Sequence, residues 1–91
     1  MPTTHDIKCQ PDQFAALLNG SKRFEFRRND RNYKVGDLLT VREYRIGSNT
    51  YTDRAATFEV LYITRCFDWL PNPNEWADWV VMSLSEPLPN A

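Results

Sequence analysis

The chain has little of what metal sites, disulfide scaffolds and membrane spans require. Its 91 residues include two cysteines, Cys9 and Cys66, and one histidine, His5. A structural zinc site takes about four ligands, so we expect no metal and no cofactor. No apolar run approaches the ~20 residues of a membrane span, and residues 1–6 lack the basic and apolar regions of a signal peptide. We therefore expect a cytoplasmic protein with reduced, buried thiols and no membrane partner.

What is present is the composition of one small globular domain. The chain is 42% hydrophobic and 25% charged, and it is rich in aromatic residues at 13%. A chain of this length buries only ~60–65% of its unfolded surface, so its core is modest. We predict a single domain over 1–91, with its core at about 5–84 and a frayed tail at 85–91. A monomer is assumed.

Charge is distributed unevenly along the chain. A net charge of −1 argues against a protein that coats nucleic acid. Residues 22–45, however, hold eight basic and four acidic side chains, whereas the rest of the chain holds three basic and eight acidic ones. Such a basic central third can hold an anion locally. The alternative is that these charges form an ordinary solvated surface.

Hydrophobic periodicity and turn residues predict one helix and six short strands. Phe14, Leu17 and Leu18 recur at helical spacing and predict a helix over 11–19. Gly20 follows, where a left-handed cap is favoured. A loop that contains two tryptophans is predicted over 68–78. Strands are predicted over 6–9, 23–28, 38–44, 50–53, 57–65 and 80–84.

These elements predict an α+β fold that is mostly β. One helix cannot cover both faces of a parallel sheet, which excludes a doubly wound architecture. Mostly antiparallel strands with closely spaced turns favour a small, partly closed β-barrel of five to six strands with one N-terminal helix.

The most informative segment is residues 20–27, which read G-S-K-R-F-E-F-R. Because side chains alternate in an extended strand, Glu25 and Arg27 share one face. Phe24 and Phe26 share the other face, and we expect them to pack in the core. The charged pair is then expected to face a cleft together with Lys22. A carboxylate beside a bidentate donor can read the edge of a planar polar ligand such as a nucleobase.

The spacing Gly20-x-Lys22-x-x-Glu25-x-Arg27 resembles the signature of the ASCH domain, a branch of the PUA-like superfamily. The later V-G-D-L-L at 35–39 resembles the turn into the next strand of those barrels. Further segments resemble a small group of uncharacterised phage and bacterial relatives; they are 5–8, 24–27, 29–31, 42–44, 51–52 and 62–64. The resemblance covers about 5–84. It implies a PUA-like barrel with a cleft between barrel and helix.

The resemblance also implies the partner, single-stranded RNA or a nucleotide-like small molecule, with Lys22, Glu25 and Arg27 lining the cleft. By their own chemistry, the two cations can meet phosphate, and the carboxylate can accept a hydrogen bond from an exocyclic amine such as that of cytosine. Asn29 and Arg31 are further ligand candidates, or simply members of a tight turn. Single-stranded RNA is read by stacking on aromatic rings, for which the candidates are Tyr33, Tyr44, Tyr51, Trp69 and Trp76.

Catalysis is an alternative that the sequence favours less than binding. One ASCH branch resembles small amidohydrolases that remove an acetyl group from modified cytidine. Lys22 matches the lysine of that branch, but Glu25 stands where the branch has a threonine nucleophile. A carboxylate can act as a general base and does not replace that hydroxyl. The distant glutamate partner has no clear counterpart other than Glu75. RNA cleavage by His5 and Lys22 is a second possibility, although a lone histidine near a terminus is more often incidental.

Two interpretations in which the chain binds no nucleotide also remain open. Glu25 and Arg27 can form an internal salt bridge that merely orders the barrel, although burying such a pair is weak evidence of stabilisation. The tryptophans Trp69, Trp76 and Trp79 can close the barrel end or form a surface for a protein partner.

Overall fold

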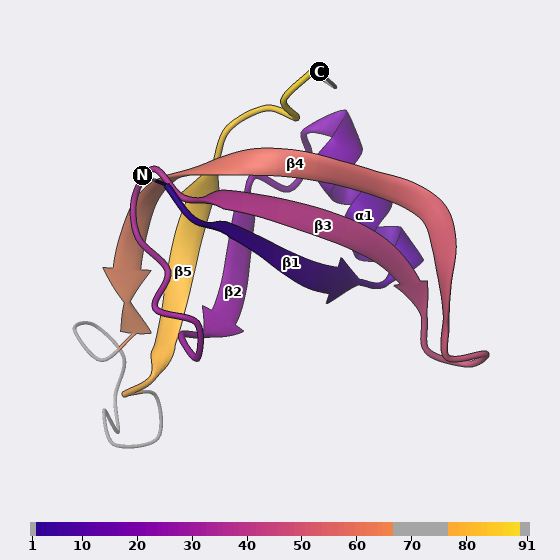
Figure 1. The fold of residues 1–91 in the computed structure, drawn as a ribbon, viewed down its shortest axis with the longest axis horizontal. Coiled ribbons are helices and arrows are strands. Elements are labelled where there is room, and N and C mark those ends of the chain that lie inside the picture. The colour runs from indigo at the N-terminus through magenta and orange to yellow at the C-terminus, as the bar shows by residue number, and fades with distance from the viewer. Residues whose placement is uncertain (1, 67–76, 90–91) are drawn as a thin grey trace.

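The computed structural model describes residues 2–66 and 77–89 as five strands and one helix (Figure 1). In chain order these are β1 (Thr4–Cys9), α1 (Pro11–Asn19), β2 (Phe24–Arg28), β3 (Leu38–Arg45), β4 (Thr50–Arg65) and β5 (Trp79–Leu84). The helix spans the predicted residues, and the strands lie within a few residues of their predicted positions. One predicted boundary between strands was wrong. Residues 50–53 and 57–65 form a single strand, because Ala55 and Ala56 between them keep their pairing with β3.

The five strands form one sheet in the order β1-β3-β4-β5-β2. β1 is parallel to β3, and the other pairs are antiparallel. The long strand β4 belongs to both halves: its first part pairs with β3, and its last part, from Val60 onward, pairs with β5, with an irregularity between Val60 and Tyr62. Figure 1 shows β5 and β2 crossing the direction of β1 and β3, with α1 beside the far end of β1.

The described strands do not close into a barrel. β1 and β2 are the two ends of the sheet order, and no pairing joins them. The small α+β, mostly β character that the sequence predicts is therefore confirmed, while the sheet itself remains open between these two edges. Two unpaired edges that face a common space leave room for a groove.

The core lies between the two halves of the sheet and α1. Inward positions alternate along β5, where Val80, Met82 and Leu84 are buried. From α1, Phe14 and Leu17 reach the same core and are almost fully buried. Burial of such side chains contributes roughly 1.5–3 kcal/mol each. Both cysteines are also buried, as predicted. This single described helix is neither long nor apolar enough to cross a membrane.

The end of α1 positions the segment that follows it. Gly20 has the left-handed φ of 86°, which most side chains disfavour. A Cβ atom there would also lie 2.8 Å from a guanidinium nitrogen of Arg23. After this cap the backbone N–H of Lys22 donates to the carbonyl of Ala16 at 3.1 Å. This bond fixes the position of Lys22 relative to α1, just before β2 begins.

The two faces of β2 are the reverse of the prediction. Phe24 and Phe26 are 46% and 42% exposed, whereas Glu25 is only 8% exposed. Glu25 lies opposite Met82 of β5 in the strand register, so both point inward, and Phe26 lies opposite Val81. On the outer face, the Phe26 ring packs against Trp79 with 4.9 Å between ring centroids. The alternation was predicted correctly; the choice of inner face was wrong.

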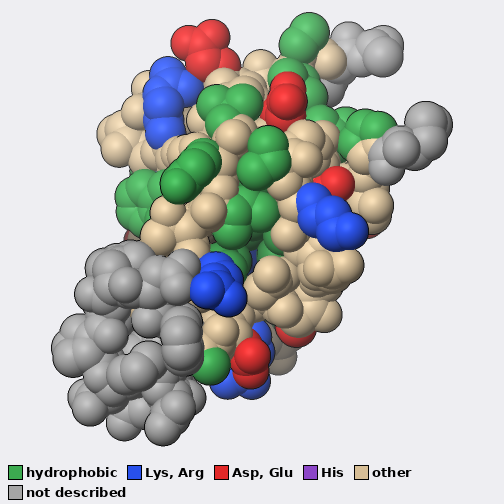
Figure 2. Space-filling model, turned by 90° about the vertical axis from the view of Figure 1, so that its left-hand side faces the viewer, with side chains coloured by type: hydrophobic (Ala, Val, Ile, Leu, Met, Phe, Trp, Pro, Cys, Tyr) green, Lys and Arg blue, Asp and Glu red, His purple; other side chains and the backbone are tan. Residues whose placement is uncertain are grey.

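Hydrophobic side chains are not confined to the core. Figure 2 shows a face on which they gather as a central band, with charged side chains scattered around it. Large hydrophobic residues that are exposed on the described surface include Tyr51, Leu61 and Tyr62.

The described part of the tail, 85–89, is hydrogen-bonded to β4. The backbone N–H of Ser85 donates to the carbonyl of Glu59, and that of Leu88 donates to the carbonyl of Thr57. The Ser85 hydroxyl also accepts a bond from the Glu59 N–H at 2.8 Å. These bonds to β4 satisfy backbone groups beyond the end of β5.

Candidate functional site

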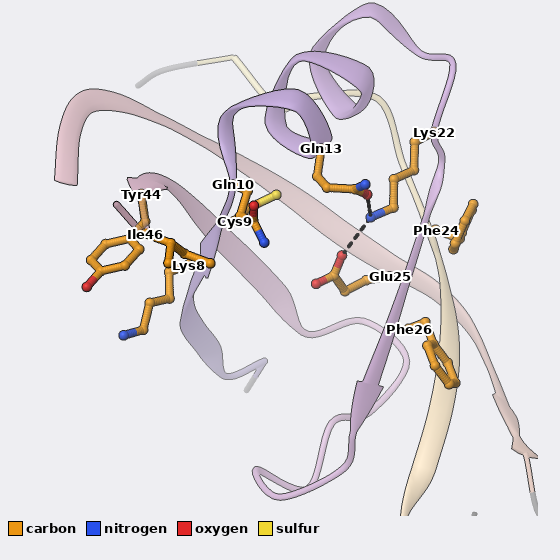
Figure 3. Close-up of a pocket in the computed structure, with 10 residues that line it drawn as sticks. All are labelled: Lys8, Cys9, Gln10, Gln13, Lys22, Phe24, Glu25, Phe26, Tyr44 and Ile46. Atoms are coloured by element: carbon orange, nitrogen blue, oxygen red, sulfur yellow. Dashed lines mark hydrogen bonds and ion pairs between the residues drawn. The ribbon is translucent and has the colours of Figure 1, made fainter. Parts of the chain in front are cut away.

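A hollow of about 570 Å³, here called the main hollow, lies beside α1 between the two open edges of the sheet (Figure 3). Its lining comes from the end of β1, the start of α1, β2 and the end of β3. The residues are Lys8, Cys9, Gln10, Gln13, Lys22, Phe24, Glu25, Phe26, Tyr44 and Ile46. Figure 3 shows the rings of Phe24 and Phe26 turned to the side of β2 opposite Glu25. The polar groups therefore occupy the inner side of β2.

Lys22 reaches into the main hollow from the turn between α1 and β2. Its ammonium donates to Oε1 of Gln13 at 2.7 Å and lies 3.5 Å from Oε1 of Glu25 (Figure 3). The same nitrogen lies 5.3 Å from the centroid of the Phe24 ring, within range of a cation–π contact. These contacts from α1 and β2 hold the Lys22 ammonium in one place at the wall of the hollow.

Arg27 completes a cluster of three charged groups. Its guanidinium donates to Oε2 of Glu25 at 3.2 Å, so Glu25 bridges Lys22 and Arg27 through its two oxygens. The side chains of Lys22, Glu25 and Arg27 are 17%, 10% and 29% exposed. We call these three residues the charged cluster. It carries two positive charges and one negative charge. Lys22 and Glu25 line the main hollow, whereas Arg27 lines two smaller hollows beside it.

Cys9 lies in the same hollow, at the end of β1. Burial, together with a smaller effect of the nearby Glu25 carboxylate, raises the pKa of its thiol to about 11. The thiol is therefore protonated at neutral pH and is a poor nucleophile or metal ligand. Among the described residues, no three His, Cys, Asp or Glu side chains gather in a way that could hold a metal ion.

Tyr44 stands at the rim of the main hollow, as the prediction of a ligand-binding tyrosine requires. Its ring makes an edge contact with Tyr51, with 5.0 Å between ring centroids. The Lys8 ammonium lies 4.6 Å from the Tyr44 ring centroid. Sequence reasoning did not select Lys8 or Gln13, because each reaches the site from an element that carries no part of the G-x-K-x-x-E-x-R motif.

Asn29 and Arg31, the two candidates in the turn after β2, have separate surroundings. The Asn29 side chain accepts a hydrogen bond from the backbone N–H of Tyr33 at 2.8 Å, which stabilises the turn itself. Arg31 donates to the backbone carbonyl of Asp6, on the open edge of β1. Neither residue lines the main hollow. Arg31 and Arg27 instead line two smaller hollows beside it.

His5 is a buried structural residue and lies apart from Lys22. Its Nε2 forms a hydrogen bond with Oδ2 of Asp37 at 2.9 Å, and its ring contacts Tyr33. The hydrogen bond to His5 is the main reason that the pKa of Asp37 is lowered, and the N–H groups of Thr3 and Lys34 add to the effect. His5 is not among the residues that line the main hollow. The described structure thus does not bring His5 and Lys22 together for acid–base catalysis.

Several predicted residues lie outside the described part of the chain. They are Trp69, Glu75 and Trp76, all in the segment 67–76.

The fold and site define a small, mostly β domain with a charged hollow between two open sheet edges. The chain belongs to a family described as a domain of unknown function (DUF3850), whose model matches residues 4–84. That range includes every described helix and strand and the whole charged cluster.

The chain is also similar to a protein of Escherichia phage P2. This relative is called "Uncharacterized 12.9 kDa protein in GpA 3'region" and is 37% identical over 70 residues. The aligned region makes up 77% of this chain and 62% of the relative. The chain thus matches less than two thirds of the length of that relative. Neither name states an activity.

Proposed function

We propose that this chain binds RNA or a nucleotide-like ligand in the main hollow, without catalysing a reaction. The observation that carries the proposal is the charged cluster. Lys22 and Glu25 line a hollow large enough for a small ligand, and Arg27 contacts Glu25 from the two hollows beside it. Removing three charges from water is costly, so an internal ion pair alone is a weak reason to gather them there.

The chemistry of the cluster suits a nucleotide. Lys22 and Arg27 offer donors to phosphate, and the guanidinium can also grip a base edge with two parallel hydrogen bonds. Glu25 can only accept, and it therefore favours a base with an exocyclic amine. Tyr44 at the rim offers an aromatic face on which a base can stack.

We also propose that the fold is PUA-like and that the resemblance to the ASCH domain reflects a common origin. Three features support this: the helix between the first two strands, the glycine cap before the charged motif, and the turn at 35–37 that leads into β3. In that turn Gly36 has a φ of 94°, and Asp37 accepts hydrogen bonds from the neighbouring backbone.

The test is a titration of cytidine monophosphate and of short RNA into the wild-type protein and into the Lys22→Ala and Arg27→Ala variants. We expect each variant to lose about tenfold or more in affinity, since each removes a charge-assisted hydrogen bond to the ligand. Lys34→Ala is the matched control, because Lys34 is exposed and lines none of the three hollows. Unchanged affinity in both cluster variants would refute the proposal.

A small hydrolase acting on a nucleoside amide is the second candidate. The contact between the Lys22 ammonium and the Glu25 carboxylate favours it, since a carboxylate held in a hollow can act as a general base toward water. Among the described residues, no serine or threonine lines the main hollow, so such an enzyme would have to use water as the nucleophile. Incubation with acetylated cytidine followed by chromatography tests it; absence of cytidine at high protein concentration eliminates this candidate.

A further inference from the structure

We infer that the main hollow is one part of a longer groove that takes a single-stranded oligonucleotide, so that a chain of two or more nucleotides binds more tightly than one nucleotide. This inference rests on the proposed function, because it specifies which member of that ligand class the site takes. It is carried by a second group of cations and by a tyrosine pair outside the charged cluster.

Two further hollows adjoin the main one. Their volumes are about 310 and 480 Å³, and we call them the second and third hollows. Glu25 lines both the main and the second hollow, Arg27 and Arg31 line both the second and the third, and Lys8 lines both the third and the main. Because neighbouring hollows share these walls, they form one continuous groove along the gap between β1 and β2.

The third hollow is strongly positive. Four of its lining residues are cations, Lys8, Arg27, Arg31 and Arg42, and its one carboxylate is Asp6. The ion pair between Asp6 and Arg42 spans 3.7 Å and is about half exposed at both ends, so it is weak and can yield to a phosphate.

Arg31 is held at the groove by its bond to the backbone carbonyl of Asp6. A guanidinium has five N–H donors, so it retains donors for a ligand while that bond is kept. The remaining donors of Arg31 are therefore held beside the open edge of β1. Because the side chain is already ordered, it loses less conformational entropy when a phosphate binds.

The tyrosine pair favours a nucleic-acid strand over other anionic ligands. Tyr44 lines the main hollow and Tyr51 lines the third, and the Tyr51 side chain is more than half exposed. Aromatic faces interleaved with cations are the arrangement that single-stranded nucleic acid requires, whereas an acidic peptide requires only the cations. One base in the main hollow and the next on Tyr51 would place the phosphate between them near Lys8 and Arg42.

The experiment compares cytidine monophosphate, a cytidine dinucleotide and a cytidine hexamer, as RNA and as DNA, by calorimetry at several salt concentrations. We expect the hexamer to bind wild type about tenfold or more tightly than the mononucleotide, because each stacked base adds affinity. Arg42→Gln and Tyr51→Ala should weaken hexamer binding and leave mononucleotide binding unchanged. Arg42→Gln should also reduce the salt slope for the hexamer by about 0.7, the value for one lost phosphate contact. Arg54→Gln is the control, since Arg54 lines none of the three hollows.

The outcomes separate this inference from the proposed function. Equal affinity for hexamer and mononucleotide, or an equal loss of both in Arg42→Gln, overturns the groove and leaves a site for one nucleotide. Absence of binding by every ligand overturns the proposed function itself. Equal competition by an acidic peptide overturns the assignment to nucleic acid. Equal binding of the RNA and DNA hexamers supports the groove and assigns recognition to phosphates and bases in place of the 2′-hydroxyl.

Discussion

Removing the carboxylate of Glu25 tests the charged cluster most directly. The Glu25→Ala variant leaves the Lys22 ammonium and the Arg27 guanidinium near each other without the group that lies 3.5 Å from one and 3.2 Å from the other. Exposed ion pairs contribute about 0–1 kcal/mol, and breaking a fully buried pair costs about 3–5 kcal/mol. The cluster lies between these limits, with side chains 10–29% exposed. We therefore expect a loss of about 2 kcal/mol in the free energy of unfolding.

The assay is thermal and urea unfolding of the unliganded protein. In a domain of this size, 1 kcal/mol corresponds to a change in melting temperature of about 4–8 °C, so Glu25→Ala should melt about 8–16 °C below wild type. Glu25→Gln should lose less, because the amide keeps the size and one acceptor. Glu86→Ala is the matched control. Glu86 is 81% exposed and pairs with Arg23 at the surface, and its removal should change stability by less than about 0.5 kcal/mol.

The refuting result is a Glu25→Ala variant that melts together with the Glu86→Ala control. In that case the carboxylate does not bridge two cations in solution, and the basis of the proposed site is lost. Lys22→Ala and Arg27→Ala each leave Glu25 with one cationic partner. We expect each of them to lose only about 1 kcal/mol, so that weaker ligand binding can be separated from unfolding.

Two further predictions concern groups outside the charged cluster. The pKa of Asp37 is lowered, so its contribution to stability is complete above the unfolded pKa of about 3.9 and is lost as the pH falls through the folded value. The stability difference between wild type and Asp37→Asn in urea unfolding should therefore shrink below about pH 4, and a difference that stays the same from pH 4 down to pH 2 would contradict the bond to His5. The pKa of Cys9 is about 11, so its thiol should react slowly. In a Cys66→Ser variant, where Cys9 is the one remaining cysteine, labelling by a thiol reagent at pH 8 should proceed at roughly one-hundredth of the rate of free cysteine. Rapid labelling of the folded protein would show that Cys9 is not buried as described.

Local features of the sequence predicted local structure well. Apolar spacing and Gly20 set the ends of α1, because helix periodicity and a left-handed cap depend only on nearby residues. The alternation of β2 placed Glu25 and Arg27 on one face, and the structure confirms their contact. The prediction that Lys22 joins them is confirmed as well. That Asp37 bonds its neighbouring backbone also followed from the turn sequence.

Long-range features were predicted less well. Residues 50–65 contain polar residues that read as a break, yet pairing with β3 carries the strand through them. Lys8, Cys9 and Gln13 join the site only because β1 and α1 meet β2 in space, and no motif marks them. His5 was judged incidental from its place near the terminus, but its partner Asp37 lies 32 positions away in the chain.

The sequence by itself determined the helix, the positions of the strands and the pairing of opposite charges along β2, because these depend on residues within a few positions of one another. The tertiary structure alone decided which face of β2 turns inward. Alternation gives a strand two faces but does not determine which of them is buried. The pairing with β5 places Glu25 opposite the buried Met82, so the Glu25 face turns inward. Two cations neutralise that carboxylate, and the unpaired edges of β1 and β2 leave a hollow beside it. The inward face of β2 therefore carries Glu25 to the wall of the main hollow.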